Sequence, residues 1–292
     1  MEKIGKIISQ VSLGTDPQGL LTTLRKEIRT CRCGEQFTAY IKVVNGQDVL
    51  DGLTLCHDCL NEVSYQKHKS ELLTKLPAFQ LQGRKNWLDS CNLPGLFRGK
   101  TFANFEKQFQ PKAFDAIKGY QGRSMVLLSP NLYGVGKTHL VAALMNDIIE
   151  KTEPAVFRAD DLSIRWRQCP VYLTAENILL GRLRQTFNRS NQHNDDEFYE
   201  ETEEDVYREL EEHHLLIIDD VGKVRPKDYS FLQGVYFRII DSRYTSQKPI
   251  ILTTNLDFAE LENHIGGACA DRLLEMAGKD GFIKMSGKSY RK

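Results

Sequence analysis

Short apolar runs alternate with amphipathic stretches from about residue 96 onward. Residues 125–128 form a run typical of a buried strand, and apolar residues then recur at helical spacing through residues 140–148. Residues 171–174, 215–218 and 250–254 predict three further strands. Strands separated by helices predict an α/β fold with a mostly parallel sheet covered on both faces. Such sheets bind ligands at the carboxyl ends of their strands.

The chain before residue 93 follows a different pattern. It contains two close cysteine pairs and then a polar, helix-favouring stretch from Asn61 to Lys75, before Leu93-Pro94-Gly95 punctuates the sequence. No internal repeat is apparent. We therefore expect a small N-terminal domain with a helical linker over residues 1–92, and a larger α/β domain over residues 93–292.

Two stretches of the larger domain are expected to be insertions outside the core. One spans residues 151–170, and the other is an acidic segment with its approach from Gly181. Between Asp195 and Glu212 there are eleven acidic residues and one basic residue, so the rest of this chain of zero formal net charge carries +10. We expect a solvated acidic loop here, while the basic remainder is compatible with nucleic-acid binding.

The bulk composition is that of an ordinary globular protein, with 41% hydrophobic and 27% charged residues. No apolar run approaches the roughly 18 residues that a membrane span requires. The opening residues lack the long apolar stretch of a secretory signal. We therefore expect a cytoplasmic protein that is not attached to a membrane.

The strongest chemical signal is the stretch Asn-Leu-Tyr-Gly-Val-Gly-Lys-Thr at residues 131–138. It lies between a predicted strand and a predicted helix, which is the context of a phosphate-binding loop. Its glycines let backbone N–H groups approach phosphates, and Lys137 would reach the β- and γ-phosphates. The motif expects glycine where this chain has Asn131, but asparagine tolerates left-handed backbone angles, so we expect the loop to form. The predicted nucleotide contacts are Asn131, Gly134, Val135, Gly136, Lys137, Thr138 and His139.

Polar residues follow two of the predicted strands. An acidic residue at the tip of a buried strand is unfavourable unless it meets a cation or hydrogen-bond donors, so we expect Asp219 to bind magnesium together with the Thr138 hydroxyl. Asp220 would orient or deprotonate the attacking water. Many ATPases carry glutamate there, and the shorter aspartate would slow hydrolysis. Asn255, after the strand at 250–254, is a candidate sensor of the γ-phosphate.

Four of the seven cysteines form two pairs separated by 22 residues: Cys31, Cys33, Cys56 and Cys59. Four thiolates in two such pairs give zinc the tetrahedral sulfur site that it prefers. Gly34 suits the tight turn of a zinc knuckle, and His57 is an alternative ligand. A cytosolic chain is not expected to build a disulfide framework. We expect a structural zinc ion, which would stabilise a domain this small.

Five motifs occur in the order in which a known family has them. They are Gly134-Val135-Gly136-Lys137-Thr138-His139-Leu140, Leu216-Ile217-Ile218-Asp219-Asp220, Leu252-Thr253-Thr254-Asn255, Asp271-Arg272-Leu273 and Ser289-Tyr290-Arg291. Together they resemble the AAA+ ATPases of the DnaC/DnaI helicase-loader and IstB transposition-helper group. The resemblance covers roughly residues 93–292 and implies the P-loop AAA+ sheet flanked by helices.

The resemblance also implies a homo-oligomer in which one subunit's arginine reaches the ATP of its neighbour. In this chain that arginine is Arg272, whose guanidinium would stabilise charge on the γ-phosphoryl oxygens. An ion pair with Asp271 or Glu275 is the alternative. Arg291 resembles the family's second-sensor arginine, and Arg243 is a weaker candidate for facing a neighbouring subunit.

Two partner contacts are implied by the same resemblance. Arg182, Arg184 and Arg189 would contact single-stranded DNA, with a solvated helix face as the alternative. Some loaders of this group carry a zinc-bearing front domain that grips the replicative helicase. Docking to that helicase is therefore the role expected of residues 1–92, and DNA binding by a zinc ribbon is the competing role.

The expected function is that of an ATP-dependent DNA replication protein that loads the replicative helicase onto single-stranded DNA. It would hydrolyse ATP with magnesium and hold zinc. Two alternatives stay open: an ATPase helper of a transposase, and an ATP-binding scaffold of low turnover, which Asn131 and Asp220 keep possible. The cysteine module favours the loader.

Overall fold

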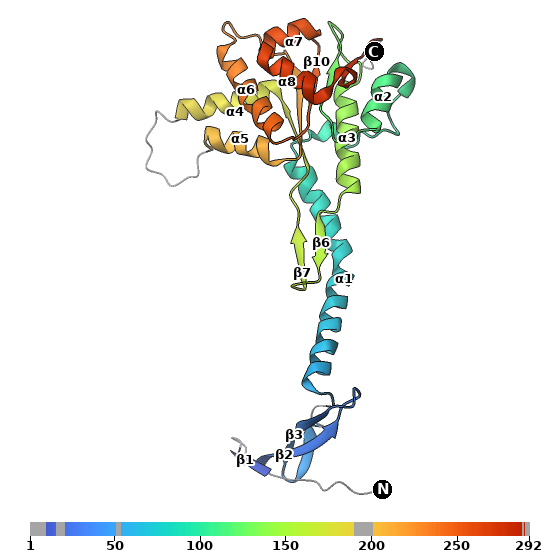
Figure 1. Ribbon diagram of the computed structural model, residues 1–292, viewed down its shortest axis with the longest axis vertical. Helices are drawn as coiled ribbons and strands as arrows, with labels where there is room; N and C mark the ends of the chain where they lie inside the picture. Colours follow the sequence, from blue (N-terminus) through green and yellow to red (C-terminus); the bar gives the residue numbers. More distant parts are fainter. Residues whose placement is uncertain (1–9, 16–20, 51–53, 190–200, 288, 290–292) are drawn as a thin grey trace. The chain divides into compact units, whose positions relative to one another are not determined.

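The computed structural model describes residues 10–15, 21–50, 54–189, 201–287 and 289 (Figure 1). The chain divides into two compact units, Met1–Leu76 with Phe157–Ile164, and Pro77–Val156 with Arg165–Lys292. Each unit is described separately. The division expected after residue 92 stays a prediction, and the helix that precedes that position belongs in part to each unit.

A four-stranded antiparallel sheet forms the first unit, and the hydrophobic pattern did not predict it. The strands pair in chain order, β1 (Gln10–Thr15), β2 (Leu21–Thr30), β3 (Gln36–Val44) and β4 (Gln47–Leu50). β3 alternates between buried and exposed side chains, since Ala39 and Ile41 are buried while Tyr40 between them is 51% exposed. Asn45 and Gly46, both with positive φ, form the two-residue turn into β4.

The helix α1 (His57–Ser90) contains the stretch that was expected to be helical. It begins directly after Cys56 and ends before Cys91. None of the helices in the described part of the chain combines the length and apolar character that crossing a bilayer requires.

The segment expected to be an insertion at residues 151–170 contains a two-stranded sheet of β6 (Ala155–Arg158) and β7 (Ser163–Trp166). Its outer residues do not fit the expectation, because Ala155 and Cys169 are buried. The reading that the whole segment lies outside the core is therefore wrong at both of its ends.

The second unit contains a five-stranded parallel sheet in the order β11-β5-β10-β9-β8. The four predicted strands are confirmed as β5 (Met125–Leu128), β8 (Val171–Ala175), β9 (Leu215–Val221) and β10 (Ile250–Thr254). β11 (Phe282–Lys284) was not predicted, because three residues ending in lysine give no recognisable apolar run.

Helices cover both faces of this sheet, and successive strand residues point to opposite cores. In β9, Leu215 and Ile217 join one core while Leu216 and Ile218 join the other. The first core contains the end of α1, α2 (Pro111–Lys118) and α3 (Lys137–Lys151). The second contains α4 (Glu176–Arg189), α5 (Glu203–Glu212), α6 (Ser230–Thr245), α7 (Phe258–Ile265) and α8 (Gly267–Ala277). Figure 1 shows α3 on one side of the sheet and α4, α5 and α6 on the other.

The acidic segment is largely a core element where the structure describes it. Thr202 caps α5 through a reciprocal pair of hydrogen bonds with Asp205, and Val206, Tyr207 and Leu210 are buried in the second core. The prediction of a solvated loop outside the core is therefore wrong for residues 201–212, where the carboxylates form the outer face of an amphipathic helix. Residues 195–200 lie outside the described residues.

Arg243, in α6, is fully buried, with 1% of its surface exposed. Its guanidinium donates to the backbone carbonyls of Leu210 (2.8 Å), His214 (2.5 Å) and Pro249 (2.7 Å). Burial lowers its pKa to about 10. The expectation that Arg243 faces a neighbouring subunit is therefore wrong, since the side chain joins the end of α5 to the starts of β9 and β10.

Candidate functional site

The loop between β5 and α3 has the backbone conformation of a glycine turn. Gly134 and Gly136 have positive φ values of 72° and 97°, and Asn131 has φ 56°. The expectation that asparagine adopts the left-handed conformation here is confirmed. The backbone N–H of Asn131 donates to the carbonyl of Asn255 (3.0 Å), so the loop is tied to the carboxyl end of β10.

Lys137, the first residue of α3, is 6% exposed and points to the carboxyl ends of the strands. Its ammonium group donates to Oδ1 of Asn255 (2.5 Å) and to the Ser129 hydroxyl. The Ser129 hydroxyl also lies 3.1 Å from Oδ1 of Asn255. Ser129 directly follows β5, and no pattern in the sequence distinguishes it from an ordinary loop serine.

The Asp219 carboxylate, at the end of β9, is 6% exposed. It accepts hydrogen bonds from Oγ1 of Thr138 (2.9 Å) and Oγ1 of Thr253 (2.5 Å). Burial, followed by the charge of Asp220, raises its pKa. A buried carboxylate beside a hydroxyl offers the oxygen ligands that magnesium prefers, so this donor set fits the expected ion.

Asp220, the next residue, has a left-handed backbone with φ 59°. Its backbone N–H donates to Oγ1 of Thr253 (3.0 Å), and its Oδ2 pairs with Nζ of Lys223 at 2.6 Å. Lys223 is a pocket residue that was not predicted from the sequence. Its spacing of three residues from Asp220 was the only available signal.

Several of these residues line one cavity of about 300 Å³, and Asp219 lies behind Thr138, outside the lining. The lining residues are Leu96, Phe97, Lys100, Tyr133, Gly134, Val135, Gly136, Lys137, Thr138, His139, Asp220, Lys223 and Asn255. A larger hollow of about 490 Å³ includes Ser124 and Pro249, which precede β5 and β10. None of the predicted site residues lines it, so the smaller cavity is the better candidate for the chemistry.

His139, which was predicted to contact the nucleotide, lines the cavity, and its ring also contacts residues that precede α2. Its Nε2 lies 2.9 Å from Oδ1 of Asn104 and 3.2 Å from the carbonyl of Thr101, and its ring packs edge-on against Phe105. Burial lowers its pKa. The side chain therefore fixes the first turn of α3 to the segment that precedes α2.

The structure does not bring Arg272 to this cavity. Its guanidinium, on α8, pairs with Asp241 of α6 (2.9 Å) and lies over the ring of Phe237 (4.8 Å). The expected alternative partners, Asp271 and Glu275, are not the ones that it uses, because α8 packs against α6. Arg291 lies outside the described residues.

The basic residues expected to meet DNA differ from one another. Arg182 pairs with Glu201 (2.5 Å) and Glu209 (2.7 Å), so the acidic segment neutralises it. Arg184 is exposed and lies over the ring of Phe231 at 5.7 Å. The side chain of Arg189 lies outside the described residues.

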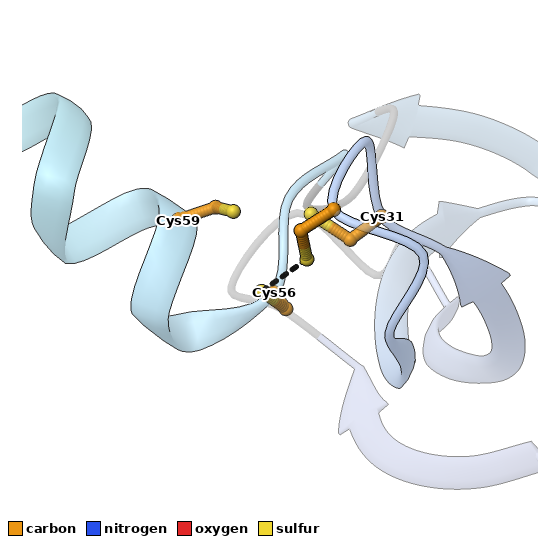
Figure 2. Close-up of side chains that lie close together, drawn as sticks. Cys31, Cys56 and Cys59 are labelled. Atoms are coloured by element: carbon orange, nitrogen blue, oxygen red, sulfur yellow. Dashed lines mark hydrogen bonds between the residues drawn. The ribbon is translucent and has the colours of Figure 1, made fainter.

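The cysteine cluster belongs to the first unit. The Sγ atoms of Cys31, Cys33, Cys56 and Cys59 all lie within 4.8 Å of one another. Figure 2 shows Cys31 and Cys56 on the loops and Cys59 on the first turn of α1, with their sulfurs turned toward one another. Backbone N–H groups of Cys33 and Cys56 lower the pKa of Cys31 to about 6, whereas burial and the neighbouring thiols raise the pKa of Cys56 and Cys59, so the hydrogen bonds of the cluster favour a thiolate at Cys31. His57 hydrogen-bonds to Asn61 and is not part of the cluster, so four sulfurs fit the expected zinc ion.

Known proteins similar to this chain include helicase loaders. No protein-family model matches it. The replicative helicase loaders DnaC of Escherichia coli K12 and of Shigella flexneri are each 22% identical to it over 180 residues, which is 62% of this chain and 62% of the relative. The chain thus spans less than two thirds of the length of these relatives. This similarity confirms the resemblance to DnaC-like AAA+ ATPases.

Solved structures give similar matches. The crystal structure of the DnaC helicase loader has 20% identity and a TM-score of 0.48, covering 66% of this chain and 100% of that chain. The crystal structure of DnaI has 15% identity and a TM-score of 0.42, covering 68% of this chain and 94% of that chain. The five-stranded parallel sheet with its glycine turn and flanking helices agrees with the P-loop AAA+ sheet that the resemblance implied.

Replacing the buried carboxylate should stabilise the ligand-free protein. Because burial raises the pKa of Asp219, the native state binds its proton more tightly than the unfolded chain does, and stability falls as the pH rises above the ordinary value of 3.8. Asp219→Asn is expected to raise the free energy of unfolding by about 0.5–2 kcal/mol at pH 7. Urea unfolding without nucleotide or magnesium measures this, and the difference from wild type should shrink toward pH 4.

Asp228→Asn is the matched control. The exposed Asp228 has its pKa lowered by the backbone N–H and hydroxyl of Ser230, so its ionised form is favoured by folding and the amide should not stabilise the protein. A lower free energy of unfolding for Asp219→Asn at neutral pH would contradict the account of Asp219.

The cysteine cluster should hold zinc. We expect about one zinc ion per purified chain and the loss of most of it in Cys59→Ser, because one of four thiolate ligands is removed. Metal analysis by mass spectrometry measures the content. Cys269→Ala, at a buried cysteine of α8, should keep its zinc. Equal zinc contents in the two variants would exclude the cluster as the binding site.

Proposed function

We propose that this chain is an ATP-dependent DNA replication protein that loads a replicative helicase onto single-stranded DNA. One observation carries the proposal: the ammonium of Lys137, the hydroxyl of Thr138 and the buried carboxylate of Asp219 converge beside a glycine turn. That arrangement suits a nucleoside triphosphate with its metal. The similarity to proteins named as replicative helicase loaders supports the choice of process.

ATP would enter the 300 Å³ cavity with its phosphates on the glycine turn. The backbone N–H groups of the turn and the start of α3 favour anions, and Lys137 would leave its neutral partners for the β- and γ-phosphates. Thr138 and Asp219 would hold magnesium, which when bound would neutralise phosphate charge. Leu96, Phe97 and Tyr133 add apolar and aromatic surface that suits a nucleobase.

Hydrolysis would depend on Asp220 and on a neighbouring subunit. Asp220 would orient the attacking water, and Asn255 would contact the γ-phosphate. Arg272, on the outer face of α8 where it is 28% exposed, would reach the ATP of the next subunit. In that position it would exchange Asp241 for the phosphate oxygens.

A scaffold of low turnover is a second candidate, and one contact favours it. The ammonium of Lys223 pairs with Oδ2 of Asp220 at 2.6 Å and so occupies an oxygen that would otherwise accept from the attacking water. Turnover would then require Lys223 to release Asp220 and to pair with another anion. The γ-phosphate of an ATP molecule bound in the same cavity is the candidate for that anion.

Partner binding is assigned to separate parts of the chain. The first unit, with its cysteine cluster, would dock the helicase. Single-stranded DNA would meet the basic residues of α4, where it would compete with Glu201 and Glu209 for Arg182. Arg182 would therefore contact DNA only after its ion pairs with Glu201 and Glu209 are broken.

Two substitutions should separate ATP binding from hydrolysis. Lys137→Ala should weaken ATP binding by at least about 30-fold, because the phosphates lose a buried cation. Arg272→Ala should keep its affinity but lower turnover by roughly 10³-fold, because transition-state charge is no longer stabilised across subunits. Fluorescent-nucleotide titration and phosphate release measure the two quantities.

Mixing the two inactive variants tests the subunit arrangement. Arg272→Ala subunits have an intact cavity and Lys137→Ala subunits have an intact arginine, so the mixture should regain part of the turnover. Lys112→Ala, at an exposed lysine of α2, is the control and should behave as wild type. A fully active Arg272→Ala protein, or a mixture as inactive as its components, would argue against action between subunits.

The partner should be a replicative helicase. Purification of the tagged chain from its native cells should recover that helicase, and the recovered protein should bind again when purified. Cys59→Ser should lose it, because the docking unit is disrupted, while Lys137→Ala should retain it. Recovery of a transposase in place of a helicase would favour the transposition helper and overturn the proposed role.

A further inference from the structure

Glu176, the first residue of α4, carries a carboxylate in the second core that the mechanism above does not use. It follows the carboxyl end of β8 directly and is 1% exposed. A buried carboxylate is unfavourable unless hydrogen bonds or cations compensate for its lost hydration. Its partners therefore indicate what it is placed to hold.

Both oxygens of this carboxylate accept two hydrogen bonds. Oε2 accepts from the backbone N–H groups of Gly222 and Val224, each at 3.0 Å. Oε1 contacts the Tyr236 hydroxyl at 2.8 Å and Nε2 of His264 at 2.6 Å. One side chain thus connects the turn after β9 with α6 and α7.

The turn after β9 begins at Gly222, two residues after Asp220. Its two anchored N–H groups stand on either side of Lys223, whose ammonium pairs with Asp220. Gly222 has φ 90°, and a Cβ atom there would lie 2.5 Å from Cδ1 of Leu256. Glycine is therefore required at this position, and Glu176 fixes the backbone on both sides of the lysine.

We propose that Glu176 is a positioning residue for ATP hydrolysis, which acts by holding the turn that presents Asp220 and Lys223 to the cavity. The inference rests on the proposed function. Glu176 does not line the cavity, so it acts through the backbone of Gly222 and Val224. Displacement of a reacting group by about 1 Å costs up to roughly 100-fold in rate, so a loosened turn should lower turnover more than it lowers nucleotide affinity.

Glu176→Ala and Glu176→Gln give the central test. The glutamine oxygen still accepts from the two backbone N–H groups, while its amide donates toward Tyr236, whose hydroxyl accepts as well as donates. We expect Glu176→Ala to lower kcat by roughly 10- to 100-fold with ATP affinity within about threefold of wild type. Glu176→Gln should restore most of the turnover.

Tyr236→Phe is the matched control. It removes one hydrogen bond to the same carboxylate but leaves the contacts to Gly222 and Val224 in place. It should lower Tm while keeping kcat near that of wild type. A role limited to core stability would make kcat in the three variants follow their Tm values.

Hydrogen exchange reports on the turn itself. The amides of Gly222 and Val224 should exchange at least about tenfold faster in Glu176→Ala than in wild type, and at nearly wild-type rates in Tyr236→Phe. If Glu176→Ala does not fold, Glu176→Asp retains the charge on a shorter side chain and should show the same loss of kcat with retained affinity.

The outcomes distinguish this inference from the proposed function. A wild-type protein that shows no ATP turnover would overturn the proposed hydrolysis. An active wild-type protein with unchanged kcat and unchanged exchange in Glu176→Ala, or in Glu176→Asp where the alanine variant is unfolded, would overturn the positioning role alone.

Discussion

The burial of Asp219 at the tip of β9 is the constraint on which the second unit depends. The parallel sheet brings this carboxylate into contact with hydroxyl groups from α3 and β10, Thr138 and Thr253. These two donors stabilise the carboxylate only in part, since its pKa stays raised. The fold therefore holds an anion in a place where a divalent cation would relieve its desolvation. Folding favours the neutral form of Asp219, whereas cation binding needs the charged form, and such conflicts are common at functional sites.

The sequence was sufficient to predict the central sheet and the phosphate loop. Continuous apolar runs identify strands that are buried on both faces, and a glycine-rich turn between strand and helix has few other uses. Asn131 shows that even a departure from the motif can be interpreted from backbone preferences, because its φ of 56° is in the region that asparagine tolerates. These features are local, so a single sequence contains them.

Features set by tertiary contacts were not predicted. Arginine is usually exposed, so the burial of Arg243 was not expected. Its guanidinium binds backbone carbonyls at the end of α5 and before β9 and β10, which are brought together only in the folded protein. The charge of α5 concealed the apolar face formed by Val206 and Leu210. Glu176 gave no signal, because its partners lie at least 46 residues away in the sequence. The sheet of the first unit was not predicted, because polar and charged residues interrupt the apolar positions within its strands.

The two units use different means to hold their functional groups. In the first, four cysteines meet across a hairpin turn and the start of a helix, so a metal ion would supply stability that a small sheet lacks. In the second, a large core positions charged groups at the edge of a sheet. Loss of metal should therefore disturb the first unit while leaving the second folded.

The contacts of Lys137 determine how much the loop must rearrange when a ligand binds. The ammonium rests on Ser129 and Asn255, two neutral oxygen acceptors, and the loop that carries it is already bonded to β10. An incoming anion would exchange these acceptors for stronger ones without reshaping the backbone. Little conformational entropy would then be lost at this step. Asn255 would lose its hydrogen bond to Lys137 when the ligand binds, so binding would change the contacts at the carboxyl end of β10.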